Sequence, residues 1–299
     1  LFSQRHSLNL TWVEVVTAPL LLCLAAAAEY RMIGRPEMFS HLLAVVFIYL
    51  YERHRSTADK WLWALLPLQI LWANIHEAFA VGWAIAAIYT VGAWLDYWLQ
   101  ARTKQALSKP LRLTLVSALL IPAVVVNPYG WVQLQSPANI FGQVFENKYT
   151  SELLDYHSLT YWTKEVYIAI GLLLLTLLGY IVMWLKQGKT ANGTQLFLQK
   201  YGTAYCLLIG AFVYLAATAH RNVVFVSYAL FPMAVVSLST LLAQWNYTNQ
   251  LFTKYTRAAY IKMIVLTLLA YGLVVSNKYY EWTNSRDRFG LEVLSTQNP

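Results

Sequence analysis

Long apolar runs separated by short polar connections recur along almost the whole chain. A helix needs about 20 residues to cross about 30 Å of hydrocarbon, and lipid offers no partners for exposed backbone groups. The pattern therefore predicts an all-α fold, a polytopic transmembrane helical bundle of about eight to nine membrane segments. The segments are Trp12–Ala28, Met38–Tyr51, Trp61–Ala73, Ala78–Leu99, Leu113–Val126, Val166–Leu185, Gly202–Ala219, Val223–Ala243 and Tyr260–Ser276.

Composition supports this interpretation. The 299 residues are 58% hydrophobic and 12% charged, against about 25% charged residues in a typical soluble domain. Mean hydropathy is +0.44. No linker or repeat divides the chain, so we expect one transmembrane domain over residues 1–299, in contact with membrane lipids.

The distribution of Lys and Arg residues over the loops indicates which side of the membrane each loop faces. If every segment crosses, 14 of the 22 Lys and Arg residues fall on one side, which the positive-inside rule makes cytoplasmic. Because they lie in short loops between segments, we expect no nucleic-acid partner. Trp61–Ala73 is short enough to be a half-span instead. That alternative would leave 12 basic residues against 10 and remove most of the bias, so nine crossings are preferred.

This topology places several polar positions on the external side. One is a long loop at about 127–165, which we expect to form a subdomain with short amphipathic helices. The others are Arg35, the group around His76, and Arg221. Polar groups within membrane segments tend to face a bundle interior or a watery cavity, so we expect these groups to converge there.

Asn74, His76 and Glu77 interrupt an otherwise apolar stretch. In a continuous helix Asn74 and Glu77, three residues apart, would meet. We expect catalytic roles for Glu77, as a general base, and for His76, as its partner or as a phosphate ligand. We expect Asn74 to bind substrate beside them. The alternative is a polar turn between two helices. No cysteine or second histidine stands at a metal-ligand spacing, so no metal site is predicted here.

Two arginines are candidate substrate-binding residues. Arg35 precedes Pro36 at the external end of a segment, and its planar guanidinium suits a phosphate or a carboxylate. Arg221 stands between two apolar runs and can reach an anion. The alternative for both is a side chain that extends to the membrane interface.

The external loop adds a pair of acids. Glu152 and Asp155 are three residues apart and can bind substrate, hold a divalent cation or act as acid and base. A solvated loop face explains them equally well. No cofactor is predicted.

Several short motifs together resemble bacterial polytopic proteins related to GT-C glycosyltransferases. These are Arg35-Pro36-Glu37-Met38-Phe39-Ser40 with Tyr51-Glu52-Arg53 after an apolar span, Leu71-Trp72-Ala73-Asn74-Ile75-His76, Asn127-Pro128-Tyr129-Gly130, and Arg221 before Pro232. The similarity spans roughly Arg35 to Pro232. It departs at Glu77-Ala78, where the relatives have Gly-Gly.

The resemblance implies a GT-C-like fold in a bacterial inner (plasma) membrane. It also implies transfer of a sugar from a polyprenyl-phosphate carrier on the external face. In these relatives the catalytic acid lies in the first external loop, so we expect this chain to begin beyond that loop. The alternative function is a non-catalytic GT-C-like scaffold that packs against other membrane subunits. A transporter is a third possibility, but many transporters contain an internal repeat, and this sequence shows none.

Overall fold

The structure is a computed structural model that describes residues 10–31, 36–57, 60–99, 104–139, 142, 153–187, 202–243, 264–265, 268–269, 271–273 and 275–282. All regular elements within these ranges are helical, which confirms the predicted all-α class. The α-helices are α2 (Leu10–Ala28), α3 (Glu37–Thr57), α4 (Leu65–Ile75), α5 (Ala80–Leu99), α6 (Lys104–Ala123), α8 (Lys164–Gln187), α10 (Thr203–Thr218), α11 (Val223–Ala243) and α14 (Lys278–Trp282). The short 3₁₀ helices are η1 (Glu29–Arg31), η2 (Lys60–Ala64), η3 (Glu77–Phe79), η4 (Gly130–Gln135), η6 (Leu159–Tyr161) and η7 (His220–Asn222).

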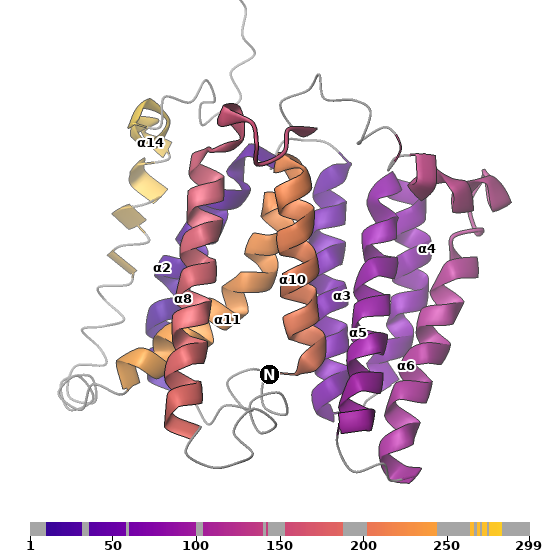
Figure 1. Cartoon of the computed structure of the whole chain (residues 1–299). Coiled ribbons are helices and arrows are strands. Elements are labelled where there is room, and N and C mark those ends of the chain that lie inside the picture. The colour runs from indigo at the N-terminus through magenta and orange to yellow at the C-terminus, as the bar shows by residue number, and fades with distance from the viewer. Residues whose placement is uncertain are drawn as a thin grey trace, which may run out of the picture.

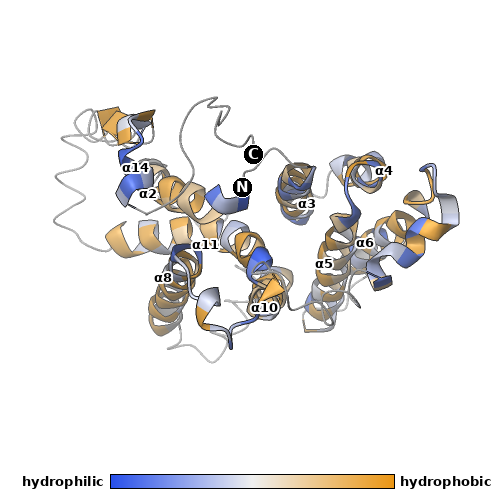
Figure 2. Ribbon diagram, turned by 90° about the horizontal axis from the view of Figure 1, so that it is seen from above, coloured by the Kyte–Doolittle hydropathy of each residue, from blue (hydrophilic) through white to orange (hydrophobic). Residues whose placement is uncertain are grey.

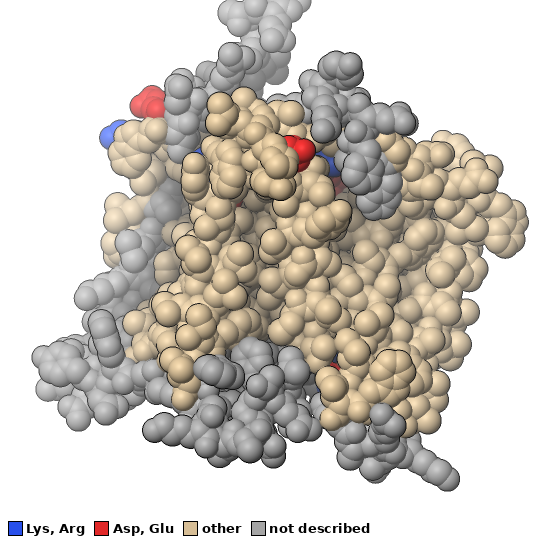
Figure 3. Space-filling view, in the orientation of Figure 1, with Lys and Arg blue, Asp and Glu red and all other residues tan. Residues whose placement is uncertain are grey.

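Within the described ranges, three helical stretches are long and apolar enough to cross a membrane. They are Glu77–Leu99, Lys164–Val182 and His220–Leu242, and Thr203–Thr218 is a shorter apolar helix. The described part of the face in Figure 3 is almost entirely uncharged, and its few charged side chains lie mainly near the upper end. These features indicate an integral membrane protein.

The helices form two groups that meet along α3, α5, α10 and α11. One group contains α2, α8, α10 and α11, and the other contains α3, α4, α5 and α6 (Figures 1 and 2). Of the three membrane-length stretches, His220–Leu242, which contains α11, is the most buried, at 72% against 33% for each of the other two. The helix α11 packs against α8, α2, α10 and α3. Contacts between α5 and α10 join the groups.

The 3₁₀ helices η3 and η7 lie at the same end of the bundle, the upper end in Figure 1. The helix η3 connects α4 to α5, and η7 connects α10 to α11. The described part of the predicted external loop contains η4, four further helical residues at 136–139, η6 and the first residues of α8. Polar connections far apart in the sequence therefore gather at this end, which we call the upper end.

The short predicted segment Trp61–Ala73 forms η2 and then α4, a helix of 11 residues. Together they lead from the end of α3 to the start of α5 and pack against α3 and α6 (Figure 1). The helix stops where the sequence places Asn-Ile-His-Glu, since His76 is extended with φ −154° and ψ 141°. The predicted break is therefore present, and a full crossing stays a prediction.

A buried polar cluster ties the helices together at the lower end. Glu52 is 3% exposed, and its carboxylate accepts from Arg55 Nη2 at 3.1 Å and from the Tyr89 hydroxyl at 3.1 Å. Nearby, the Thr203 hydroxyl donates to Asp96, which links α10 to α5. Because a buried charge is costly without partners, this arrangement allows Glu52 to stay inside the bundle.

Gly92 gives the first prediction, at the contact between α5 and α10. A Cβ atom on Gly92 would lie 2.4 Å from Cα and 2.6 Å from N of Ala204, so the two helix backbones would have to separate. We expect Gly92→Ala to destabilise the protein by about 1–3 kcal/mol through overpacking. Thermal unfolding of the protein in lipid nanodiscs measures the change.

Gly210→Ala, on α10, is the matched control, since a Cβ there has no neighbour within 4 Å. Helix propensity alone favours alanine over glycine by about 1 kcal/mol. The control should therefore be neutral or stabilising. A Gly92→Ala variant as stable as the Gly210→Ala control would contradict the close approach of α5 and α10.

Candidate functional site

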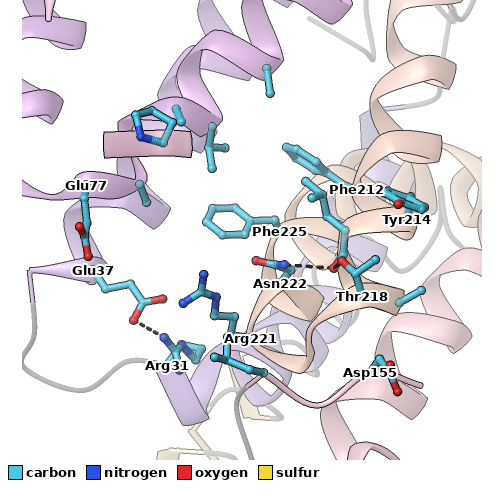
Figure 4. A pocket seen from close by; sticks show the side chains of 18 of the residues that line it. Arg31, Glu37, Glu77, Asp155, Phe212, Tyr214, Thr218, Arg221, Asn222 and Phe225 are labelled. Carbon is cyan, nitrogen blue, oxygen red and sulfur yellow. Dashed lines mark hydrogen bonds and ion pairs between the residues drawn. The ribbon is translucent and has the colours of Figure 1, made fainter. Parts of the chain in front are cut away.

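A cavity of about 470 Å³ lies at the upper end, where the two helix groups meet. Its apolar wall comes from α5, α10 and α11 and includes Ala80, Val81, Ala84, Phe212, Leu215 and Phe225. Its polar lining includes Arg31, Glu37, His76, Glu77, Asp155, His157 and Arg221 (Figure 4). A cavity that combines charged side chains with an apolar wall suits an amphiphilic ligand.

The break after α4 sets the position of His76. The extended backbone at His76 returns its ring toward the start of η3, where Nδ1 accepts from the backbone N–H of Ala78 at 3.2 Å. The same Nδ1 lies 3.0 Å from Oγ of Ser40 on α3. Contacts from α3 and η3 therefore fix the ring at the edge of the cavity.

Arg221 is held by the tight connection between α10 and α11. Its neighbour His220 is buried, and Nε2 of His220 lies 2.8 Å from the Thr163 hydroxyl. The Tyr30 hydroxyl donates to the backbone oxygen of His220 at 3.0 Å. The His220 side chain thus packs inside the protein, whereas the Arg221 side chain lines the cavity. Its guanidinium extends toward the side where Glu37 and Glu77 lie (Figure 4).

Arg31 and Glu37 form an ion pair. Arg31 is the last residue of η1 and Glu37 is the first residue of α3. Both side chains line the cavity, and Arg31 is 5% exposed. An acid in the first turn of a helix is common because it complements the helix dipole. Here the same acid also supplies charge to the cavity.

Asp155 reaches the opposite wall through backbone bonds to α10 and η7. The N–H of Tyr156 donates to Ala217 O at 3.2 Å, and the N–H of His220 donates to Leu154 O at 3.0 Å. The Asp155 carboxylate accepts from the N–H of His157 at 3.1 Å, which stabilises a local turn. Asp155 therefore faces the cavity from the side away from Glu77 (Figure 4).

The electrostatics of the site centre on His76. Burial lowers the pKa of His76 below its ordinary value, while the nearby carboxylates of Glu37 and Glu77 act to raise it and Arg221 acts to lower it. The ring is therefore within electrostatic reach of an arginine and two acids. Lowering of the pKa favours a neutral imidazole at neutral pH.

The side chains of Arg221 and Glu77 are available to bind a ligand. Within the part of the chain that the structure describes, neither side chain makes a hydrogen bond or an ion pair. An unpaired guanidinium can bind a bidentate anion, and an unpaired carboxylate can accept a proton. The cavity thus offers an anion-binding group and a base.

The structure brings four of the predicted site residues together: His76, Glu77, Asp155 and Arg221. Asn74 is not among them, and it does not meet Glu77, because α4 ends at Ile75. Its amide instead donates to Val126 O at 2.9 Å and to Ile70 O at 2.8 Å, which joins the end of α4 to the turn that follows α6. Arg35 and Glu152 lie outside the described residues.

Sequence reasoning missed Glu37 and Ser40 as site residues. Both stand in the motif that begins at Arg35, but an acid in a first turn and a serine in an apolar helix are ordinary features. Their roles depend on contacts with η1 and with His76, which are distant in sequence.

Among the described residues, no group of three or more His, Cys, Asp or Glu side chains is arranged to hold a metal ion. No protein-family model matches this chain, and neither the curated proteins nor the solved structures include one with detectable similarity to it.

Proposed function

We propose that this protein is a GT-C-like glycosyltransferase of about eight to nine membrane segments in a bacterial inner membrane. It transfers a sugar from a polyprenyl-phosphate carrier to an acceptor on the external face. The observation that carries the proposal is one cavity that combines an apolar wall with an arginine and a carboxylate, Arg221 and Glu77, that have no partner among the described residues.

The cavity suits both parts of such a donor. The apolar wall from α5, α10 and α11 takes the start of the prenyl chain, because burying hydrocarbon there removes it from water. The guanidinium of Arg221 and the imidazole of His76 meet the phosphate oxygens. The sugar then lies toward the water-exposed carboxylate of Glu77.

The transfer step needs one base and one stabilised leaving group. The acceptor hydroxyl attacks the anomeric carbon and gives its proton to Glu77 as the new C–O bond forms. The bond between the anomeric carbon and the phosphate oxygen breaks, and its electron pair leaves with the polyprenyl phosphate. Arg221 and His76 stabilise the charge that develops on that phosphate.

The test of this proposal is binding of undecaprenyl phosphate to the protein in lipid nanodiscs, followed by native mass spectrometry. We expect the phosphate to bind more tightly than undecaprenol, which has the same chain without the charge. Arg221→Ala should weaken binding of the phosphate by about 10- to 100-fold, since a hydrogen bond to a charged group contributes about 1.5–3 kcal/mol.

Arg112→Ala is the matched control, because Arg112 is an exposed arginine on α6 that does not line the cavity. This variant should bind undecaprenyl phosphate as the wild type does. Equal binding of undecaprenyl phosphate and undecaprenol, or wild-type affinity in Arg221→Ala, would contradict the proposal. Either result would favour the non-catalytic scaffold.

A further inference from the structure

A short chain of hydrogen bonds behind the cavity ends on Nδ1 of His76. The indole N–H of Trp72 donates to Oγ of Ser40 at 2.8 Å, and this Oγ lies 3.0 Å from His76 Nδ1. The backbone N–H of Ala78 also donates to the same Nδ1, at 3.2 Å. Trp72 and Ser40 are both 0% exposed, so water does not compete for these contacts.

The direction of each bond follows from the groups involved. A backbone N–H and an indole N–H only donate. Ala78 therefore requires a lone pair on His76 Nδ1. Because the Ser40 oxygen already accepts from Trp72, its single proton is available for that same Nδ1. Two donors thus converge on Nδ1, and a neutral imidazole in this position carries its hydrogen on Nε2.

We propose that Ser40, oriented by Trp72, is a positioning residue that holds His76 in the Nε2–H form. In this form His76 acts as a hydrogen-bond donor to an anionic oxygen in the cavity and does not act as a base. The role of His76 toward a phosphate rests on the proposed function, whereas the tautomer itself does not. The assignment leaves Glu77 as the base at this end of the cavity.

The arrangement depends on the helix break. Ser40 lies on α3, Trp72 on α4 and Ala78 in η3, and the extended conformation of His76 lets its ring meet Ser40 and Ala78. The lowered pKa of His76 agrees with a neutral ring, with burial as its main cause and the charges of Glu37, Glu77, Arg221 and Arg31 around it.

Nitrogen-15 NMR of the histidine-labelled protein in lipid bilayers tests the inference. The chain has six histidines, and His76→Gln identifies the His76 signals by their loss. At pH 7.5 we expect Nδ1 of His76 to resonate as an unprotonated nitrogen and Nε2 as a protonated one. In Ser40→Ala, the Nδ1 signal should shift because one of its two donors is gone, and Ser40→Thr should restore it.

Ser227→Ala is the matched control. Ser227 is also 0% exposed in an apolar helix, but its hydroxyl donates to Val223 O of its own helix. Its removal should leave the His76 signals unchanged. A protonated Nδ1 in the wild type would overturn the inference, and an unchanged Nδ1 signal in Ser40→Ala would overturn the role of Ser40.

A kinetic measurement separates this inference from the proposed function. With a donor that supports sugar transfer, Ser40→Ala should lower the turnover number up to about tenfold, the loss expected for one neutral hydrogen bond of up to about 1.5 kcal/mol. Absence of transfer in the wild type would contradict the proposed function, and the NMR result would still decide the tautomer. Wild-type turnover in Ser40→Ala would overturn the positioning role.

Discussion

Replacing Glu77 by glutamine is expected to lower the turnover number of sugar transfer by about 10²- to 10⁴-fold, the usual contribution of a general base. Glutamine keeps the size of the side chain and its hydrogen-bonding capacity but cannot take the proton of the acceptor hydroxyl. Binding of undecaprenyl phosphate should stay within about twofold of the wild type, since a base acts in the transition state. The measurement is transfer of labelled sugar by the protein in proteoliposomes.

Two further variants show whether Glu77 is the base. Glu281→Gln changes an exposed carboxylate on α14 that does not line the cavity, so transfer should be unaffected. Asp155→Asn changes the acid on the opposite wall, where the carboxylate already stabilises a turn. Full turnover in Glu77→Gln together with a large loss in Asp155→Asn would assign the base to Asp155.

The contrast between Arg221 and Glu77 makes the two proposed roles distinguishable. Removal of Arg221 should mainly weaken binding of the phosphate, because the guanidinium meets it before and during reaction. Removal of the Glu77 carboxylate should lower turnover with little effect on binding. If the Arg221 and Glu77 variants are less stable but keep wild-type binding and turnover, the residues around His76 form only a polar turn between two helices. That is the alternative that the sequence also allows.

The sequence predicted the all-α class and the presence of membrane-length apolar helices, because apolar length is a direct physical requirement of membrane helices. It also predicted that the group around His76 and Arg221 would meet, because alternating crossings bring their connections to one end of the bundle. That argument uses only the order of the segments and the positions of basic residues. It needs no knowledge of side-chain contacts.

The details of the site could not be predicted in this way. The assumption of a continuous helix paired Asn74 with Glu77, but the extended residue His76 separates them. No local pattern indicates that His76 turns back to a serine on another helix, because that contact depends on how α3 packs against α4 and η3. Tertiary packing also gave Arg31 a partner in Glu37.

At the lower end, Gly202→Ala is expected to destabilise the protein more than any other glycine-to-alanine change considered. Gly202 has φ +83° and ψ 125°, a conformation that is strained for residues with a Cβ by about 1–3 kcal/mol. A Cβ there would also lie 1.4 Å from Nη1 of Arg55. The guanidinium would have to shift, and a shift that breaks its contact with Glu52 costs up to about 3–5 kcal/mol.

Gly130→Ala separates the two causes. Gly130 also has a positive φ, +55°, but a Cβ on it would have no neighbour within 4 Å. Thermal unfolding should therefore show a small loss of stability in Gly130→Ala, from backbone strain alone, and a larger loss in Gly202→Ala. Equal losses would mean that Arg55 adapts without giving up Glu52.

The same variant also tests whether the two ends of the bundle act independently. The cluster of Glu52, Arg55 and Tyr89 lies at the end opposite the cavity, and none of its members lines that cavity. Below its unfolding temperature, Gly202→Ala should therefore bind undecaprenyl phosphate with wild-type affinity. Loss of binding in a folded Gly202→Ala protein would show that packing at the lower end controls the shape of the cavity through α3, α5 and α10.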